Sequence, residues 1–251
     1  MFTEYKQGYA SVVMDHFDFV ARHGLDPYTD KNKPLIVFGV YRKEDLKVVE
    51  NHKGKVLIRW CGVDSKEVTE RSAKVLRRPN IIHVSPHPKV IEHLSRFGIR
   101  CDEWHLRTGL AKARPQVLGN KIYVYTQKNH KKYGSHIVDR LKTPYEIVRT
   151  THWEMPIDKW KAGGCEKYYS QAFVGLALSD YAAGLGSINE MGIRGIPVIT
   201  NVVTMPHTIP WKTEGDIVEA IAKAAEHIGK WSYILAEEVE QYLNNTRSCI
   251  L

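Results

Sequence analysis

Cysteine is scarce in this sequence, and its spacing argues against a zinc site. Only four cysteines occur in 251 residues, at Cys61, Cys101, Cys165 and Cys249. No C-x-x-C pair is present, and no histidine lies at the spacing that a zinc site needs. Free thiols in a reducing compartment are the simplest interpretation.

Long apolar runs are also missing. The largely uncharged stretch between Tyr168 and Glu190 is interrupted by Asp180 and by a glycine-containing turn, which argues against a membrane-spanning helix. The first twenty residues include acidic side chains and no continuous apolar core, so they do not resemble a secretory signal. We therefore expect a cytoplasmic protein.

Acidic residues are fewer than basic ones. Lys and Arg number 36 and Asp and Glu 28, for a net charge of +8. This balance attracts anions such as phosphodiesters, acidic glycans, nucleic acid or anionic lipid. The basic residues are scattered through both halves without a helix-turn-helix, zinc or aromatic RNA-binding motif. We therefore expect no nucleic-acid partner, and an anionic membrane surface remains open as a partner.

Short apolar runs alternate with helical stretches in the first half. A helix over residues 9–23 and a polar turn over 26–30 come first. We expect strands over 34–39, 55–60, 81–84 and 100–106, and helices over 42–51, 66–76 and 88–97. This alternation predicts a parallel sheet covered on both faces.

The alternation of apolar runs and helical stretches is interrupted over residues 107–119 and then resumes. We expect strands over 121–126, 145–150, 172–178 and 197–200, and helices over 134–141, 158–170, 187–194, 216–228 and 231–243. The fold class predicted is α/β, with two Rossmann-like βαβ domains facing a cleft. We assign residues 1–115 to a first domain and 116–228 to a second. Residues 229–251 form a C-terminal helix expected to pack back towards the first domain.

The segment from Leu178 to Thr200 predicts an anion site. A strand runs into a loop with Gly184 and Gly186, and then into a helix whose first turn holds Ser187 and Ile188. The free N–H groups of such a helix start favour a bound diphosphate. Glu190, one turn further on, is a candidate ligand for ribose hydroxyls.

This segment resembles the E-x7-E region of retaining glycosyltransferases of the GT-B fold, family 4 in particular, in which a glutamate is followed by G-x-P-V-I. Here the second glutamate is Glu190, and residues 195–199 read Gly-Ile-Pro-Val-Ile. Ala182 stands in the place of the first glutamate, and Asp180 is the candidate substitute. Residues 60–64, Trp-Cys-Gly-Val-Asp, also resemble a turn of small relatives, which makes Asp64 the second catalytic candidate.

The resemblance implies a nucleoside-diphosphate sugar such as GDP-mannose or UDP-glucose as donor, bound by residues 116–228, which makes this the nucleotide-sugar-binding domain. It implies a glycan or other hydroxyl as acceptor, with residues 1–115 as the acceptor-side domain, and transfer with retention. No cofactor is expected, and the absence of a D-x-D triplet fits metal independence. The loop after residue 125 carries lysines where the family has a basic pair for the diphosphate. The remaining donor-binding candidates are Tyr125, Thr126, Lys128 and Lys131 in that loop, and Thr151, His152 and Trp153 towards the nucleoside.

Other interpretations stay open. Glu190 could close a capping box with Ser187, Asp64 could only cap the helix after it, and Tyr168 and Tyr169 are typical of a core. The chain could also be a nucleotide-sugar binder without catalysis, a basic nucleic-acid-binding α/β protein, or a sugar-nucleotide epimerase.

Overall fold

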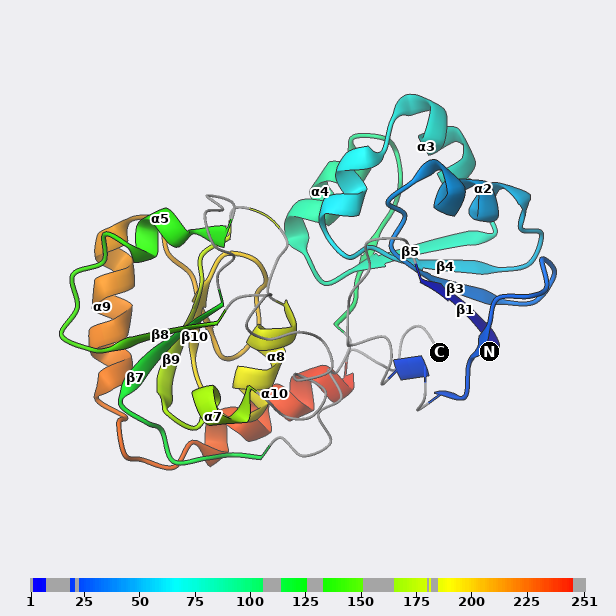
Figure 1. Cartoon of the computed structure of the whole chain (residues 1–251). Helices are drawn as coiled ribbons and strands as arrows, with labels where there is room; N and C mark the ends of the chain where they lie inside the picture. Colours follow the sequence, from blue (N-terminus) through cyan, green and yellow to red (C-terminus); the bar gives the residue numbers. More distant parts are fainter. Residues whose placement is uncertain are drawn as a thin grey trace. The chain divides into compact units, whose positions relative to one another are not determined.

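The chain forms two α/β units (Figure 1). The computed structural model describes residues 2–7, 19–20, 23–105, 114–125, 133–150, 165–179, 181 and 185–245, of which 7, 185 and 245 are described by backbone alone. One unit comprises Met1–Gly109 with Thr246–Leu251, and the other Leu110–Asn245. We expected the first domain to end at residue 115, so the observed division falls slightly earlier.

The first unit holds a parallel sheet with the strand order β2-β1-β3-β4-β5-β6. Its strands are β1 (Glu4–Gln7), β2 (Asp26–Pro27), β3 (Leu35–Phe38), β4 (Val56–Arg59), β5 (Ile81–Ser85) and β6 (Asp102–Glu103). Its helices are α2 (Lys43–Asn51), α3 (Glu70–Leu76) and α4 (Pro88–Ser95), with the 3-10 helix η1 (Val63–Glu67) before α3. Every residue of β3 and β4 is buried, as expected of central strands covered on both faces.

The amino-terminal side of this sheet corrects the sequence prediction. We expected a turn over residues 26–30, whereas Asp26 and Pro27 form the edge strand β2, and β1 was not expected. The polar sequence of β1 does not indicate a buried strand. Glu4 can be buried there because its carboxylate accepts hydrogen bonds from the Thr29 and Asp30 amides. These bonds lower the pKa of Glu4 to about 2. Most of the helix expected over 9–23 lies outside the described residues.

The second unit holds a parallel sheet with the order β11-β10-β9-β7-β8. Its strands are β7 (Lys121–Tyr125), β8 (Ile147–Thr150), β9 (Ala172–Ala177), β10 (Val198–Thr200) and β11 (Thr208–Ile209). Its helices are α5 (Ser135–Val138), α7 (Glu166–Tyr169), α8 (Leu185–Ile193), α9 (Glu214–Ala225) and α10 (Tyr233–Asn245). Helix α9 lies on one face of the sheet, and α8 and α10 lie on the other (Figure 1). Strand β11 was not expected.

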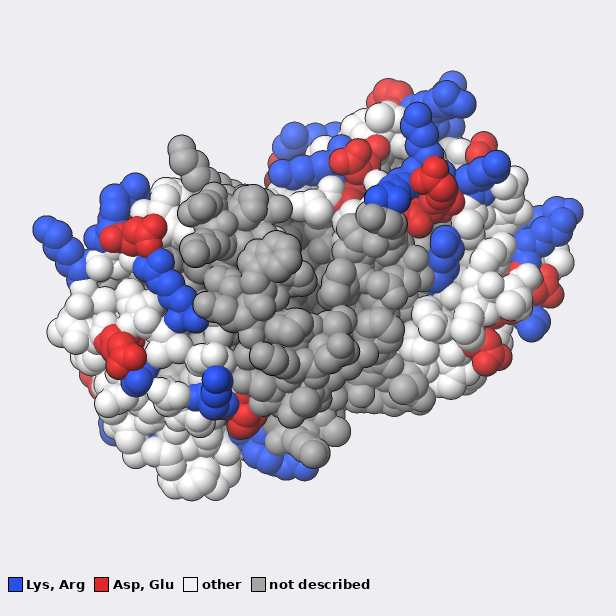
Figure 2. Space-filling model, in the orientation of Figure 1, with Lys and Arg blue, Asp and Glu red and all other residues white. Residues whose placement is uncertain are grey.

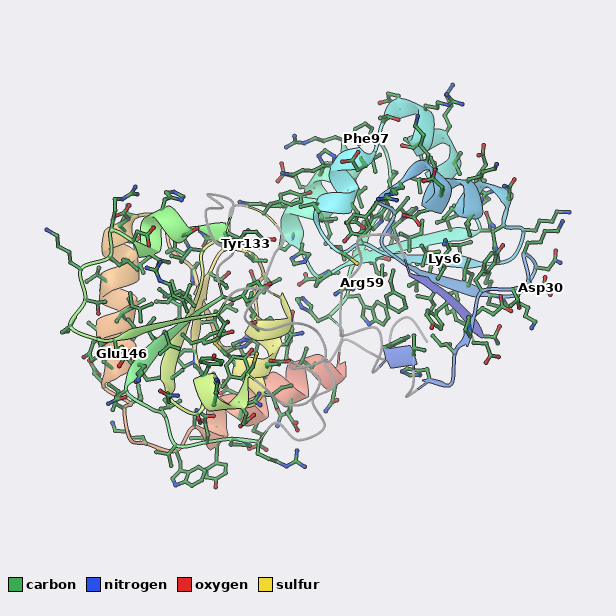
Figure 3. All side chains as sticks on the ribbon, in the orientation of Figure 1. Lys6, Asp30, Arg59, Phe97, Tyr133 and Glu146 are labelled. Carbon is green, nitrogen blue, oxygen red and sulfur yellow. The ribbon has the colours of Figure 1, made fainter. Side chains whose placement is uncertain are left out.

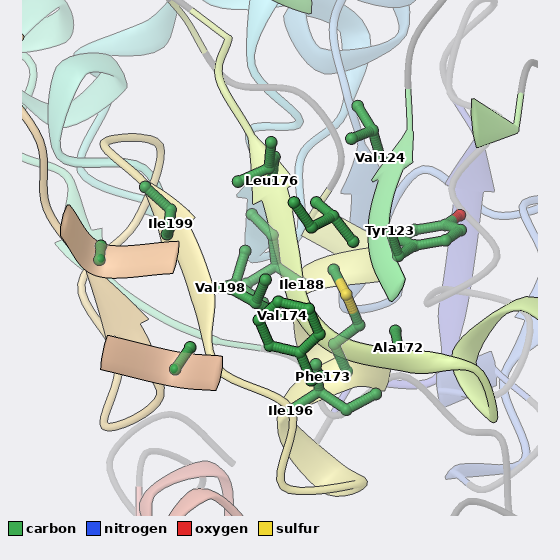
Figure 4. Packing of buried hydrophobic residues seen from close by; sticks show 14 of the residues in the cluster. Tyr123, Val124, Ala172, Phe173, Val174, Leu176, Ile188, Ile196, Val198 and Ile199 are labelled. Atoms are coloured by element: carbon green, nitrogen blue, oxygen red, sulfur yellow. The ribbon is translucent and has the colours of Figure 1, made fainter. Parts of the chain in front are cut away.

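Apolar side chains from β9, β10 and α8 form the core of this unit (Figure 4). Phe173 and Val198 are fully buried there, and so are Val239 and Leu243 on the inner side of α10. Because those side chains are buried here, α10 packs against α8 within its own unit. That residues 229–251 also pack back towards the first domain stays a prediction.

The two sheets share one winding scheme. In each unit the second strand lies on one side of the first, and the third, fourth and fifth strands follow on the other side. The side on which successive strands are added to the sheet therefore reverses between β1 and β3 in one unit, and between β7 and β9 in the other. Ligands of doubly wound sheets bind outside the carboxyl ends of the strands at such a switch point.

Candidate functional site

The switch point of the second unit brings together two loops that the sequence singled out. One follows β7 and ends at Gly134, and the other follows β9 and begins at Leu178. Gly134 has a φ of 73°, and an added Cβ would lie 2.5 Å from Leu178 Cβ and closer still to the Leu178 carbonyl oxygen. Only glycine fits this contact without strain, so the two loops are held side by side.

Aromatic side chains flank the first of these loops. The rings of Tyr125, at the end of β7, and Tyr133 lie 6.4 Å apart and nearly perpendicular. Burial raises the pKa of the Tyr133 phenol, so this residue (Figure 3) stays neutral at physiological pH. Tyr125, a predicted donor-binding residue, is half-buried and lies at the switch point.

Helix α8 begins at Leu185, just beyond the carboxyl end of β9. Its first N–H groups have no partner within the helix, and Gly186 and Ser187 in the first turn are only half-buried. Ser187 is the third helical residue and not the N-cap, so the capping-box interpretation of Ser187 and Glu190 is wrong. Ile188 is fully buried in the core (Figure 4), which leaves only its backbone for ligand contacts.

Glu190 lies one turn further along α8 and is fully buried. Burial of the Cys165 thiol, followed by the nearby charge of Glu190, raises the pKa of that thiol to about 12. The same two causes, in the same order, raise the pKa of the Tyr169 phenol. The guanidinium of Arg194 donates to the Glu190 carbonyl oxygen at 2.9 Å, pairs with Glu166, and lies 4.9 Å from the centre of the Tyr169 ring. These contacts place the carboxylate in a buried polar cluster beneath the first turn of α8.

The strands contribute to the same cluster. The Tyr123 hydroxyl, on β7, shares a 2.7 Å hydrogen bond with Thr150 at the end of β8, and both residues are buried. Figure 4 shows this hydroxyl pointing away from the apolar side chains. The Tyr123 ring packs edge-on against Tyr169, with centroids 4.9 Å apart. We expected no role for Tyr123 from the sequence, although a tyrosine between Ile122 and Val124 in a buried strand indicates a polar partner.

The G-x-P-V-I sequence after α8 has a structural explanation. Gly195 ends the helix with a φ of 74°, and an added Cβ would lie 2.5 Å from Ser232 Cβ. The Ser232 hydroxyl donates to the Arg194 carbonyl oxygen at 2.6 Å. Pro197 then leads into β10, the strand beside β9. This sequence therefore closes α8 against the start of α10.

Asp64, in the first unit, is fully buried. Its carboxylate accepts hydrogen bonds from the amides of Gly62 at 2.7 Å, Cys61 at 3.1 Å and Val40 at 3.3 Å. Burial raises its pKa to about 6, against the effect of these bonds and of the nearby Arg59 guanidinium on β4 (Figure 3). The contacts tie the loops after β3 and β4 together and so support a positioning role for Asp64, while the catalytic role that we expected stays a prediction.

The other predicted site residues lie outside the described part of the chain. They are Thr126, Lys128, Lys131, Thr151, His152, Trp153 and Asp180. Among the described residues, no group of three or more His, Cys, Asp or Glu side chains is placed to hold a metal ion. Within the same ranges, every helix is too short or too polar to span a bilayer.

Charge on the visible surface is mixed. In the orientation of Figure 2, Lys and Arg side chains are interspersed with Asp and Glu on both units. Surface pairs such as Arg140 with Glu214 and Arg149 with Asp139 neutralise part of the basic excess. On this face the basic side chains of the described residues are therefore mixed with acidic ones and do not form a continuous patch.

No protein-family model matches the sequence, and no curated protein matches it either. Among solved structures, sucrose-phosphate synthase from Thermosynechococcus elongatus aligns with a TM-score of 0.55 and 14% identity, over 92% of this chain and 72% of that chain. The glycosylation-associated Gap123 complex from Streptococcus agalactiae aligns with a TM-score of 0.47 and 12% identity, over 93% of this chain and 55% of that one. The GtfA/B complex aligns with a TM-score of 0.42 and 11% identity, over 93% of this chain and 60% of that one.

The match to sucrose-phosphate synthase, together with the two parallel sheets, confirms the predicted fold class of two Rossmann-like α/β units. This chain spans between 55% and 72% of the lengths of these three structures. At 14% identity, the match shows a shared fold and leaves activity to be argued from the site.

Proposed function

We propose that this protein is a glycosyltransferase that moves a sugar from a nucleoside-diphosphate sugar to a hydroxyl acceptor. The observation that carries the proposal is the position of α8. Its N-terminal turn lies at the carboxyl end of β9, at the switch point and beside the loop that follows β7. The fold shared with sucrose-phosphate synthase supports the same assignment.

The donor's diphosphate would bind at the first turn of α8, where Gly186 and Ser187 are half-buried. Backbone N–H groups and the helix dipole stabilise the negative charge at such a position. In this proposal Lys128 and Lys131 add positive charge and stabilise the departing nucleoside diphosphate without a metal ion. Thr151, His152 and Trp153 would contact the nucleoside, and Glu190 its ribose.

The resemblance to retaining family 4 extends the proposal to the stereochemistry. The sugar's anomeric configuration would be retained, and an oxygen of the donor's own phosphate would help to remove the acceptor proton. Asp180, in the loop after β9, remains the candidate for an acidic group near the reacting carbon. We assign Asp64 to holding the loops of the first unit, on the grounds of its three backbone hydrogen bonds.

Two observations favour a second candidate, a nucleotide-sugar binder without transfer. Asp64 is fully buried, and Ala182 occupies the position of the first glutamate of the E-x7-E pattern. Ala182 has no carboxylate, and that of Asp64 accepts hydrogen bonds from backbone amides. The two candidates share the donor site and differ only in turnover.

A donor-consumption assay separates them. The protein is incubated with each of several sugar nucleotides, with and without a mixture of mono- and disaccharide acceptors, and the release of nucleoside diphosphate is followed. Acceptor-dependent release supports the transferase, and binding without release supports the second candidate. Conversion of the donor to another sugar nucleotide without any acceptor would indicate an epimerase.

A further inference from the structure

Apolar side chains gather on the surface of the second unit, at the start of α10. Trp231 is 58% exposed, Tyr233 55% and Ile234 78%, and these are the three most exposed large apolar side chains in the described part of the chain. Val117, 39% exposed, joins them to complete what we call the apolar patch. Monomeric proteins rarely expose several large apolar side chains together, and such a patch is often a binding surface.

The backbone holds the apolar patch in place. Val117 and Trp231 are opposite each other in an antiparallel β-bridge, so their side chains lie on the same side. The Trp231 ring stacks on the Tyr233 ring, with centroids 4.8 Å apart and planes 13° from parallel. Between them, Ser232 is buried and its hydroxyl donates to the Arg194 carbonyl oxygen at 2.6 Å. Because the rings are already ordered, a partner that covers them would pay little conformational entropy.

The apolar patch lies at the opposite end of the sheet from the candidate donor site. Val117 precedes β7, and the Gly119 amide donates to the carbonyl oxygen of Ala172, the first residue of β9. The patch is therefore at the amino ends of these parallel strands, whereas the switch point is at their carboxyl ends. A partner bound at the patch leaves the switch point open, so this inference is independent of the proposed function.

Charged side chains of opposite sign flank the apolar patch. Lys230 is exposed directly before the first aromatic residue. Glu237 and Glu238 are exposed on α10, one turn beyond the apolar residues at its start, and so continue the same side of the helix. Among the described residues, none of these three side chains has an ion-pair partner. The surface is therefore basic at one end, apolar in the middle and acidic at the other end.

This order of charges is complementary to a second copy of itself. When a two-fold axis passes through the apolar patch, Lys230 of each copy meets Glu237 and Glu238 of the other copy. The apolar side chains of both copies then cover each other, and tryptophan and tyrosine are the residues most often found at the centre of such interfaces. An anionic bilayer would be repelled by the acidic end. We propose that the protein forms a two-fold symmetric homodimer through the apolar patch.

The size of the apolar patch sets the expected affinity. An aromatic side chain offers about 150–250 Å² for burial, so the exposed parts of Trp231 and Tyr233 supply roughly 200 Å². Specific interfaces bury about 800 Å² on each partner, so the patch would form the apolar centre and the polar side chains around it the rim. We expect a dissociation constant on the order of 10 µM.

Sedimentation velocity over a range of about 1–200 µM protein tests the homodimer. We expect the wild type to change from monomer to dimer within this range. Ile234→Glu should weaken the dimer by about tenfold or more, because it places a carboxylate in the apolar centre. Val218→Glu is the matched control, since Val218 is also an exposed apolar residue on a helix, α9, and lies outside the patch. The control should dimerise like the wild type.

A charge exchange tests the two-fold arrangement. Lys230→Glu should prevent dimerisation, and so should Glu237→Lys combined with Glu238→Lys, because like charges then meet at both ends of the interface. An equimolar mixture of these two variants should dimerise again, since opposite charges face each other at both ends of the mixed pair. Thermal melting of each variant verifies that it is folded.

A wild-type protein that stays monomeric throughout the concentration range overturns the inference, and so does a dimer that Ile234→Glu leaves intact. Charge variants that stay monomeric when mixed overturn the two-fold arrangement. Binding of the monomer to phosphatidylcholine vesicles, lost in Ile234→Glu, would assign the apolar patch to a membrane surface and overturn the homodimer. The proposed function is tested by nucleotide binding and is unaffected by each of these outcomes.

Discussion

The contact between Gly134 and Leu178 gives the sharpest prediction about the site, because it holds the two switch-point loops together. In Gly134→Ala the new methyl group meets two obstacles. The backbone has a φ of 73°, and the methyl carbon would lie 2.5 Å from Leu178 Cβ. Such a distance is far inside van der Waals contact, and part of the obstacle is backbone that cannot rotate away.

Gly229→Ala is the matched control. Gly229 has a φ of 76°, but an added Cβ has nothing within 4 Å. Both variants therefore bear the strain of a left-handed alanine, about 1–2 kcal/mol. Only Gly134→Ala adds overpacking, for which about 1–3 kcal/mol is typical. We expect the control to lose about 1–2 kcal/mol of unfolding free energy, and Gly134→Ala about 2–5 kcal/mol.

The assay is urea unfolding of the two variants and the wild type, combined with titration of the donor nucleotide. The overpacking must push the loops after β7 and β9 apart, so Gly134→Ala should also weaken nucleotide binding, whereas Gly229→Ala should not. Equal loss of stability in the two variants, with unchanged binding in both, would refute the loop contact as described.

Three further predictions follow from single contacts. Burial raises the pKa of Asp64 from 3.8 to about 6, so ionising it in the folded protein costs about 3 kcal/mol. The unfolding free energy of the wild type relative to Asp64→Asn should therefore fall by about that amount between about pH 4 and pH 7, and a constant difference would contradict the burial cost. Tyr123→Phe should lose about 1–2 kcal/mol of unfolding free energy, because Thr150 loses its 2.7 Å partner; an unchanged urea midpoint would show that this bond contributes nothing. Lys131→Ala should weaken nucleoside diphosphate binding several-fold and nucleoside binding little, and calorimetric losses of equal size for both ligands would place that lysine elsewhere.

The central strands could be predicted from sequence because their signal is strong and local. Strands β3 and β4 are short apolar runs in which every residue is buried, and the helices between them are long enough to show their own pattern. Repetition of this strand-and-helix pattern was sufficient to predict the α/β class and the presence of two sheets.

The edge of the first sheet could not be predicted in the same way. Strand β1 reads Glu-Tyr-Lys-Gln, and its buried Glu4 is stabilised by the amides of Thr29 and Asp30, which lie more than twenty residues away. A pattern within a short window contains no trace of such a partner. The two-residue strands β2 and β11 are likewise defined by their neighbours and not by their own composition.

The sequence indicated which segments form the candidate site better than it indicated what each side chain does there. A helix does occur where we expected one before Glu190, although it begins at Leu185 and includes Gly186, which we expected in the preceding loop. The burial of Asp64 and Glu190 did not follow, because it depends on loops and helices that meet only in the folded chain. We expected no role for Tyr123 and Thr150, and only a core position for Tyr169, for the same reason, since their hydroxyl groups come together from two strands and a helix.

The central claim, that the switch point of the second unit binds a nucleotide sugar, is tested most directly by calorimetric titration of the wild-type protein. The ligands are GDP-mannose, UDP-glucose, UDP-GlcNAc and ADP-glucose, in buffer without metal ions. We predict micromolar binding of one of the four, weakened by Gly134→Ala and not by Gly229→Ala. Failure of all four to bind, with or without added divalent cations, would contradict the account.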